Sequence, residues 1–159
     1  MEPAFSMILT GKRPYMFVII QNDPKVAPGT LGENLAEEGV AFRVVHPYSG
    51  EALPQVSDVS AAIVLGGAMG VHDSARYPFL TDLNCFIREG VRSTTPLLGV
   101  CLGGQLVDDA LGAAVTANMH GEKGMCSVNI SPEGKDDPLF AGLPEEFLSF
   151  QWHNDSFAL

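Results

Sequence analysis

One cysteine of this chain lies where a nucleophile would be expected, at the junction of a strand and a helix. The apolar run Pro96–Val100 predicts a short strand, and Leu102–Leu111 predicts a helix. Cys101 lies between them, flanked by Gly99 and Gly103, which are small enough to let strand and helix approach closely. The first N–H groups of a helix are unpaired and its dipole is positive there, so both effects favour a reactive thiolate.

Attack of this thiolate on a carbonyl group would create an oxyanion, which needs hydrogen-bond donors. The N–H group of Leu102 is the natural first donor because this residue follows the nucleophile. A second donor must come from another loop at the carboxyl ends of the strands. Gly66 and Gly67 directly follow the predicted strand Ala61–Leu65, and glycine permits both the backbone twist and the close approach of a substrate.

The remaining composition limits the kinds of function. Cys85 and Cys126 fall in a predicted helix and a predicted strand, where cysteine is usually an inert small hydrophobic residue. No CxxC pair occurs and the four histidines lack ligand spacing, so no disulfide framework, metal or cofactor is indicated. This cysteine usage favours a reducing, cytoplasmic location. The net charge of −10 disfavours nucleic acid and membrane partners.

Strands and helices alternate along the chain. A capping box at Thr30 and Glu33 predicts a helix that ends at Gly39, and a second helix begins at Pro78 and starts to fail at Gly90. Asp108 and Asp109 are expected on a solvated helix face, and His46 and His72 in solvated loops. Six further strands are predicted, the first of them ending at the turn Asn22-Asp23-Pro24: Tyr15–Ile20, Ala41–Val45, Ala61–Leu65, Ala113–Thr116, Cys126–Ile130 and Ser149–Trp152.

Repeated strand–helix units of this kind favour an α/β fold, with a mostly parallel sheet and helices on both faces. Residues 1–14 are interpreted as an N-terminal extension, and residues 15–159 as one domain. No segment approaches the roughly 20 apolar residues that a membrane-spanning helix needs.

The chain resembles a class I glutamine amidotransferase domain, in particular the GMP-synthase-like branch. Residues 99–105, Gly-Val-Cys-Leu-Gly-Gly-Gln, match the nucleophile elbow of that family, and residues 66–71, Gly-Gly-Ala-Met-Gly-Val, are similar to its oxyanion loop. Residues 77–80, 121–124, 137–140 and 151–157 resemble further landmarks in the same order. The likeness extends from about Tyr15 to the last residue, and it implies a flavodoxin-like, three-layer fold.

The resemblance implies that the domain hydrolyses the side-chain amide of L-glutamine through a thioester on Cys101. Carried over by position, Gly67 and Leu102 supply the oxyanion N–H groups, and Gln105 helps to hold the bound glutamine. The ammonia is released or passed to an acceptor. No synthetase segment accompanies the domain, so an acceptor enzyme would be a separate chain.

The family's activating histidine, followed two residues later by a glutamate, is expected beyond another strand, whereas six residues follow His153 here. We therefore expect the sheet to lack its last strand and helix, and the exposed edge to favour self-association. His120 has Glu122 two residues on, and His153 has Asp155, but both histidines resemble other landmarks of the family. His153, at the end of a predicted strand, is the better candidate base.

Two other functions stay open. Without an activating base, the fold could bind a partner or a metabolite without turnover. The Gly-x-Cys-x-Gly-Gly pattern also resembles the elbow of dienelactone-hydrolase-like α/β-hydrolases, which cleave ester-type substrates. Gln105 and the loop at Gly66 and Gly67 favour the amidotransferase over this hydrolase.

Overall fold

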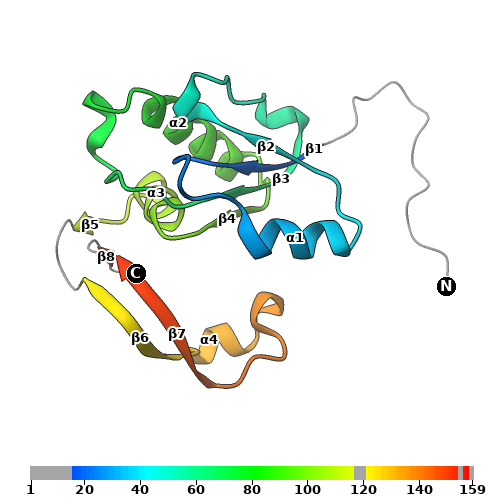
Figure 1. Ribbon diagram of the computed structural model, residues 1–159, viewed down its shortest axis with the longest axis vertical. Helices are drawn as coiled ribbons and strands as arrows, with labels where there is room; N and C mark the ends of the chain where they lie inside the picture. The colour runs from blue at the N-terminus through cyan, green and yellow to red at the C-terminus, as the bar shows by residue number, and fades with distance from the viewer. Residues whose placement is uncertain (1–15, 117–120, 154–155, 158–159) are drawn as a thin grey trace. The chain divides into compact units, whose positions relative to one another are not determined.

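The computed structural model describes residues 16–116, 121–153 and 156–157. The chain divides into two compact units, Met1–Leu111 and Gly112–Leu159 (Figure 1). The first unit holds the parallel sheet and the helices that cover it, and the second holds short antiparallel strands. None of the described helices is long and apolar enough to cross a membrane.

The sheet of the first unit has four strands in the order β2-β1-β3-β4, and all three neighbouring pairs are parallel. Its strands are β1 (Met16–Ile20), β2 (Phe42–Val45), β3 (Val59–Val64) and β4 (Leu97–Gly99). Val18, Ile19 and Ile20 are fully buried although they alternate between the two faces. A central strand that is apolar on both faces needs cover on both, as the sequence predicts.

Helices cover both faces of this sheet (Figure 1). On one face, Leu31 and Leu35 of α1 (Gly29–Glu37) pack against a cluster of three buried residues, Ile19, Ile63 and Leu65. On the other, α3 (Leu102–Leu111) lies against Val64, whose side chain alternates with that of Ile63. Helix α2 (Phe79–Arg92) packs beside α3 and buries Leu83, Phe86 and Ile87. The predicted α/β fold with a mostly parallel sheet is confirmed.

Two predicted helix boundaries are wrong. Helix α1 begins at Gly29, after Pro28, and no side chain caps it, so the predicted capping box at Thr30 does not form. Proline can start a helix because its fixed φ already suits the first turn. Helix α2 continues past Gly90 to Arg92, because Gly90 is buried in a contact with β4. A Cβ atom at Gly90 would lie 3.1 Å from Leu97 Cδ1, so the glycine serves packing and does not end the helix.

The second unit contains two antiparallel pairs of strands. In the longer pair, β6 (Glu122–Asn129) pairs with β7 (Glu146–His153) over their whole lengths, and the connection contains α4 (Pro132–Lys135). In the shorter pair, β5 (Val115–Thr116) pairs with β8 (Ser156–Phe157). The sequence predicts β5, β6 and β7, although with different ends.

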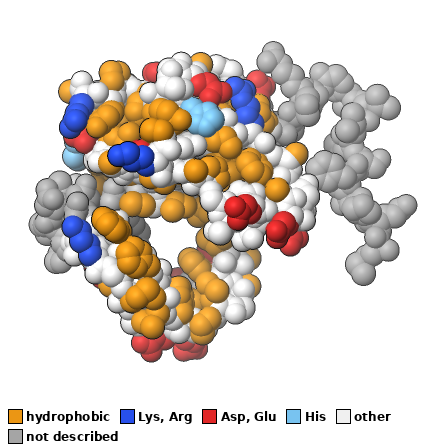
Figure 2. Space-filling view, in the orientation of Figure 1, with side chains coloured by type: hydrophobic (Ala, Val, Ile, Leu, Met, Phe, Trp, Pro, Cys, Tyr) orange, Lys and Arg blue, Asp and Glu red, His pale blue; other side chains and the backbone are white. Residues whose placement is uncertain are grey.

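The β6–β7 ribbon has one markedly apolar face, which we call the ribbon face: Met125, Leu148, Phe150 and Trp152. These side chains are 60–69% exposed. The rings of Phe150 and Trp152 pack together with their centroids 6.2 Å apart. Hydrophobic side chains are visible along this part of the chain in Figure 2. An apolar surface of this kind commonly marks an interaction site.

Candidate active site

Cys101 lies on a strained turn between β4 and α3. Its φ of +54° is in the left-handed region, which non-glycine residues rarely occupy. Backbone hydrogen bonds fix this turn: the N–H of Val100 donates to the carbonyl of Val64, and the N–H of Gly103 to the carbonyl of Val100, both at 2.9 Å. The cysteine itself is exposed. The backbone therefore adopts the nucleophile-elbow geometry that the sequence predicts.

Two glycines make this elbow possible. A Cβ atom at Gly103 would overlap the carbonyl oxygen of Val64 and lie 2.7 Å from its carbonyl carbon. A Cβ atom at Gly99 would lie 2.5 Å from the carbonyl carbon of Gly103. Both positions are closed by backbone atoms, which have no rotamer to move away. Helix α3 can thus approach the sheet only with glycine at both positions.

The loop after β3 lies against the cysteine. A Cβ atom at Gly66 would be 3.3 Å from Cys101 Cβ and 3.8 Å from Cys101 Sγ. A Cβ atom at Gly67 would be 3.1 Å from Leu102 Cδ2. Among the described residues, neither the N–H of Gly67 nor that of Leu102 donates a hydrogen bond to the protein. The structure thus brings together the predicted nucleophile and both predicted donor residues.

Helix α3 carries the other predicted binding residue. Gln105 is 7% exposed, and its N–H donates to the carbonyl of Cys101 at 3.1 Å. The expected solvated face at Asp108 and Asp109 is partly buried. Asp109 Oδ2 accepts a hydrogen bond of 3.0 Å from Asn84 on α2, and burial raises the pKa of the Asp108 carboxyl. The partial burial of these two aspartates depends on the tertiary contact between α2 and α3, which the sequence does not show.

His46 and His72, the described histidines of the first unit, make contacts that do not involve Cys101. His46 Nδ1 lies 3.3 Å from Glu51 Oε2, and the backbone N–H of His46 donates to the same oxygen at 2.8 Å. That N–H, together with the Arg43 guanidinium, lowers the pKa of Glu51. His72 lies exposed in a loop, as expected. Neither histidine is hydrogen-bonded to Cys101 Sγ.

The second unit contains a histidine–carboxylate pair that the sequence spacing does not predict. His153 Nε2 lies 3.1 Å from Glu122 Oε2, because the two residues are directly opposite each other in the β6–β7 ribbon. Spacing along the chain assigned Glu122 to His120 and Asp155 to His153. His120 and Asp155 lie outside the described residues.

The other two cysteines differ in exposure from the sequence expectation. Cys85 is exposed on α2, and Cys126 is half-buried in β6. An inert buried position for Cys85 is therefore wrong: the helix turns Leu83, Phe86 and Ile87 toward the core and leaves Cys85 outside. All three cysteines are free thiols. Exposure alone does not distinguish Cys101 from Cys85, because both are exposed. The surroundings of Cys101 must therefore account for any higher reactivity.

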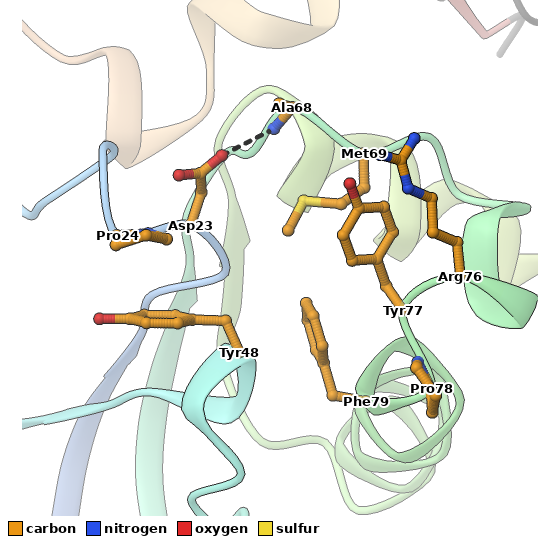
Figure 3. Close-up of a pocket in the computed structure, with 9 residues that line it drawn as sticks. All are labelled: Asp23, Pro24, Tyr48, Ala68, Met69, Arg76, Tyr77, Pro78 and Phe79. Atoms are coloured by element: carbon orange, nitrogen blue, oxygen red, sulfur yellow. Dashed lines mark hydrogen bonds between the residues drawn. The ribbon is translucent and has the colours of Figure 1, made fainter.

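A cavity of about 370 Å³ lies beside the loop at Gly66 and Gly67, among the loops that follow β1, β2 and β3 (Figure 3). Ala68 and Met69, which directly follow Gly67, form part of its wall. Cavities at the carboxyl ends of parallel strands are common ligand sites. For Asp23 and Pro24, which form part of this wall, the sequence predicts only a turn. The lining residues are Asp23, Pro24, Tyr48, Ala68, Met69, Arg76, Tyr77, Pro78 and Phe79.

The chain matches a family model and is similar in sequence to known proteins. Residues 30–159 match the family model described as glutamine amidotransferase class-I. The glutamine amidotransferase-like protein YfeJ of Salmonella typhimurium is 31% identical over 112 residues, which cover 68% of this chain and 47% of YfeJ. One subunit of the glutamine-hydrolyzing GMP synthase of Halobacterium salinarum is 36% identical over 78 residues, which cover 49% of this chain and 41% of that protein. The chain thus spans less than half the length of these relatives.

Solved structures show the same fold. A glutamine amidotransferase from Thermotoga maritima superposes with a TM-score of 0.83 at 30% identity, covering 91% of this chain and 63% of that protein. A glutamine amidotransferase from Methylobacillus flagellatus superposes with a TM-score of 0.79 at 31% identity, covering 92% and 57% of the two chains.

The elbow gives a direct test of its glycines. Gly103→Ala is expected to lower the free energy of unfolding by about 3 kcal/mol or more, because the new methyl group meets the backbone of β3. Gly104→Ala is the matched control one residue along α3, since its Cβ atom would come no closer than 3.5 Å to Gly99. Its effect should stay within about 1 kcal/mol. Equal losses for the two variants in urea unfolding would contradict a packing role specific to Gly103.

Proposed function

The chain belongs to the class I glutamine amidotransferase family, and on this basis we propose that Cys101 attacks the side-chain amide of L-glutamine. The thiolate sulfur bonds to the amide carbon, and the carbon–nitrogen bond breaks. The nitrogen takes up a proton and leaves as ammonia, and a γ-glutamyl thioester remains on the sulfur. Water then cleaves the thioester to glutamate and regenerates the thiol. The observation that carries the proposal is the exposed Cys101 at φ +54°, with Gly66 packed against it.

Three further residues take roles in this proposal. The N–H groups of Gly67 and Leu102 would stabilise the oxyanion of the tetrahedral intermediate, which calls for donors about 2.7–3.1 Å from the oxygen. Gln105 would help to hold the glutamine from the first turn of α3. Its burial supports a fixed orientation for its amide group.

Departure of ammonia also needs a proton donor. His46 and His72, the described histidines of the first unit, are not bonded to Cys101. The geometry therefore supports attack of the thiolate on the amide more strongly than the departure of ammonia that completes the thioester. This observation also favours a second candidate function, a fold that binds glutamine without hydrolysing it. The family match leaves the dienelactone-hydrolase-like alternative without support.

We also propose that ammonia passes to an acceptor enzyme on a separate chain. One relative is named as a single subunit of a GMP synthase, which supports a division of labour between chains. The three free cysteines suit a cytoplasmic setting for such an assembly.

A second copy of this chain is the proposed partner of the ribbon face. Lys123 lies at one end of this face and Glu146 at the other, with the apolar side chains between them. Two copies packed face to face with antiparallel strands would bring the lysine end of each over the glutamate end of the other. The surface is therefore self-complementary in charge as well as apolar.

The proposed nucleophile can be tested by covalent labelling. A chloroketone analogue of glutamine is expected to alkylate Cys101 at least about tenfold faster than Cys85, because only Cys101 adjoins oxyanion donors. Excess L-glutamine should slow the labelling of Cys101 alone. Cys101→Ser should abolish the protected modification, and Cys85→Ser, which removes the other exposed thiol, should leave it unchanged. Peptide mass spectrometry of the modified sites gives the rates.

Equal labelling of all three cysteines, or labelling that glutamine does not slow, would contradict the proposal. Calorimetry with glutamine separates the two candidate functions. Heat of binding to the wild type and to Cys101→Ala, without ammonia from either, would identify a binding module.

Self-association is expected to depend on the two charged ends of the ribbon face. Lys123→Glu and Glu146→Lys should each weaken the dimer about tenfold, and the double variant should recover most of the loss. Glu145→Gln is the control, because Glu145 pairs with Lys135 outside the β6–β7 ribbon. The measurement is molar mass by light scattering across a dilution series. A wild-type monomer at all concentrations would rule out this partner.

A further inference from the structure

Asn22 lies at the carboxyl end of β1, next to the oxyanion loop. It is fully buried, and its Nδ2 donates a hydrogen bond of 2.7 Å to the carbonyl oxygen of Leu65. Leu65 is the last residue before Gly66 and Gly67. A Cβ atom at Gly67 would lie 3.6 Å from Asn22 Cβ, so the asparagine also touches the loop itself.

Asp23 holds the other side of the same loop. Its Oδ2 accepts a hydrogen bond of 3.3 Å from the N–H of Ala68, the residue that follows Gly67 (Figure 3). Its Oδ1 accepts a bond of 2.9 Å from the N–H of Lys25, which fixes the orientation of the carboxylate. Two consecutive residues of one turn therefore bond to the backbone on either side of the glycine pair.

The glycine pair needs such support if it is to serve as an oxyanion donor. Glycine has the widest backbone freedom of any residue, so the peptide between Gly66 and Gly67 can rotate at little cost. Catalytic donors contribute most when they are already oriented before the charge develops. Met69 packs closely under the loop, since a Cβ atom at Gly67 would lie 2.8 Å from its sulfur. Packing limits the position of the loop, and the two hydrogen bonds restrict the glycine peptide from both sides.

The burial of Asn22 indicates a role beyond stability. Its Oδ1 is buried and has no hydrogen-bond partner among the described residues. A buried acceptor without a partner costs folding free energy, which an apolar residue of similar size would not cost. An asparagine at this position is therefore explained by its N–H group, which donates to the carbonyl of Leu65.

We propose that Asn22 is a positioning residue for the oxyanion loop and that Asp23 assists it. Asn22 fixes the peptide between Leu65 and Gly66, and Asp23 fixes the peptide between Gly67 and Ala68. The peptide between them, which carries the N–H of Gly67, is thereby restricted to the orientation that an oxyanion on the Cys101 adduct requires. This role rests on the function proposed above. It predicts that loss of the Asn22 donor impairs reactions at Cys101 that develop an oxyanion and spares those that do not.

Two electrophiles distinguish these reactions. The thiolate adds to the ketone carbon of the glutamine-analogue chloroketone, and the C=O bond opens to an oxyanion that needs the donors. The sulfur then displaces chloride from the neighbouring carbon, its bond to the former ketone carbon breaks, and the ketone is restored. Iodoacetamide is displaced directly at its methylene carbon, iodide leaves, and its carbonyl has no fixed place in the site. The ratio of the two rate constants at Cys101 therefore measures the oxyanion donors and not the access to the thiol.

Asn22→Leu keeps the size and branching of the side chain and removes the donor. The maximal rate of chloroketone labelling is expected to fall about tenfold to a hundredfold. This is less than the roughly hundredfold to thousandfold loss on removal of an oxyanion donor, because the N–H of Gly67 is still present. The half-saturating concentration and the iodoacetamide rate should stay within about twofold, because the binding contacts and the thiol are unchanged. Asn84→Leu is the matched control, since Asn84 also donates through Nδ2, to Asp109 on the neighbouring helix. It should leave the rate ratio unchanged.

Asp23→Ala covers the case in which Asn22→Leu fails to fold, because Asp23 is only half-buried. Its long bond to Ala68 predicts a smaller fall in the rate ratio, about threefold, since hydrogen bonds weaken with distance. A wild-type ratio in the folded variants would overturn the positioning role while leaving the proposed function intact. Absence of glutamine-protected labelling in the wild type would instead remove the proposed function, and this role with it.

Discussion

The contact of helix α3 with the parallel sheet is the constraint on which the site depends. Gly99 and Gly103 face backbone atoms so closely that neither has room for a Cβ atom. This approach forces the chain to turn within one residue, at Cys101, which takes a strained positive φ of +54°. The strain costs on the order of 1–3 kcal/mol. Burial of Leu102 and Leu106, each worth about 1.5–3 kcal/mol, offsets it.

The topology of the sheet places the remaining parts of the site. Strands β1, β3 and β4 are neighbours and run in the same direction, so their carboxyl ends meet at one edge. Asn22, the loop at Gly66 and Gly67, and Cys101 follow these three strands in turn. Residues that are distant in the sequence thus come into contact, as the 2.7 Å bond from Asn22 to Leu65 shows. A buried asparagine next to two glycines gives the loop an orientation that glycine alone would not keep.

The second unit follows different rules. Its strands are antiparallel, and cross-strand pairs determine which side chains meet. The register places Glu122 opposite His153, so a carboxylate 31 residues away becomes the partner of this histidine. The same register lines up Phe150 and Trp152 on an exposed apolar face. In both cases the pairing of strands, and not spacing along the chain, decides the contact.

The sequence by itself determined the alternation of strands and helices, the elbow at Cys101 and the neighbouring loop at Gly67. These features depend on local patterns: apolar periodicity, and small residues where a strand turns into a helix. Only the tertiary structure decided the roles of Asn22 and Gly90, because each depends on a residue at least seven positions away that packing brings close. From the sequence alone, Asn22 is interpreted as a turn residue and Gly90 as a residue that ends a helix. Long-range packing overrode both, since burial against a neighbouring strand or loop outweighs a local preference of about 1 kcal/mol.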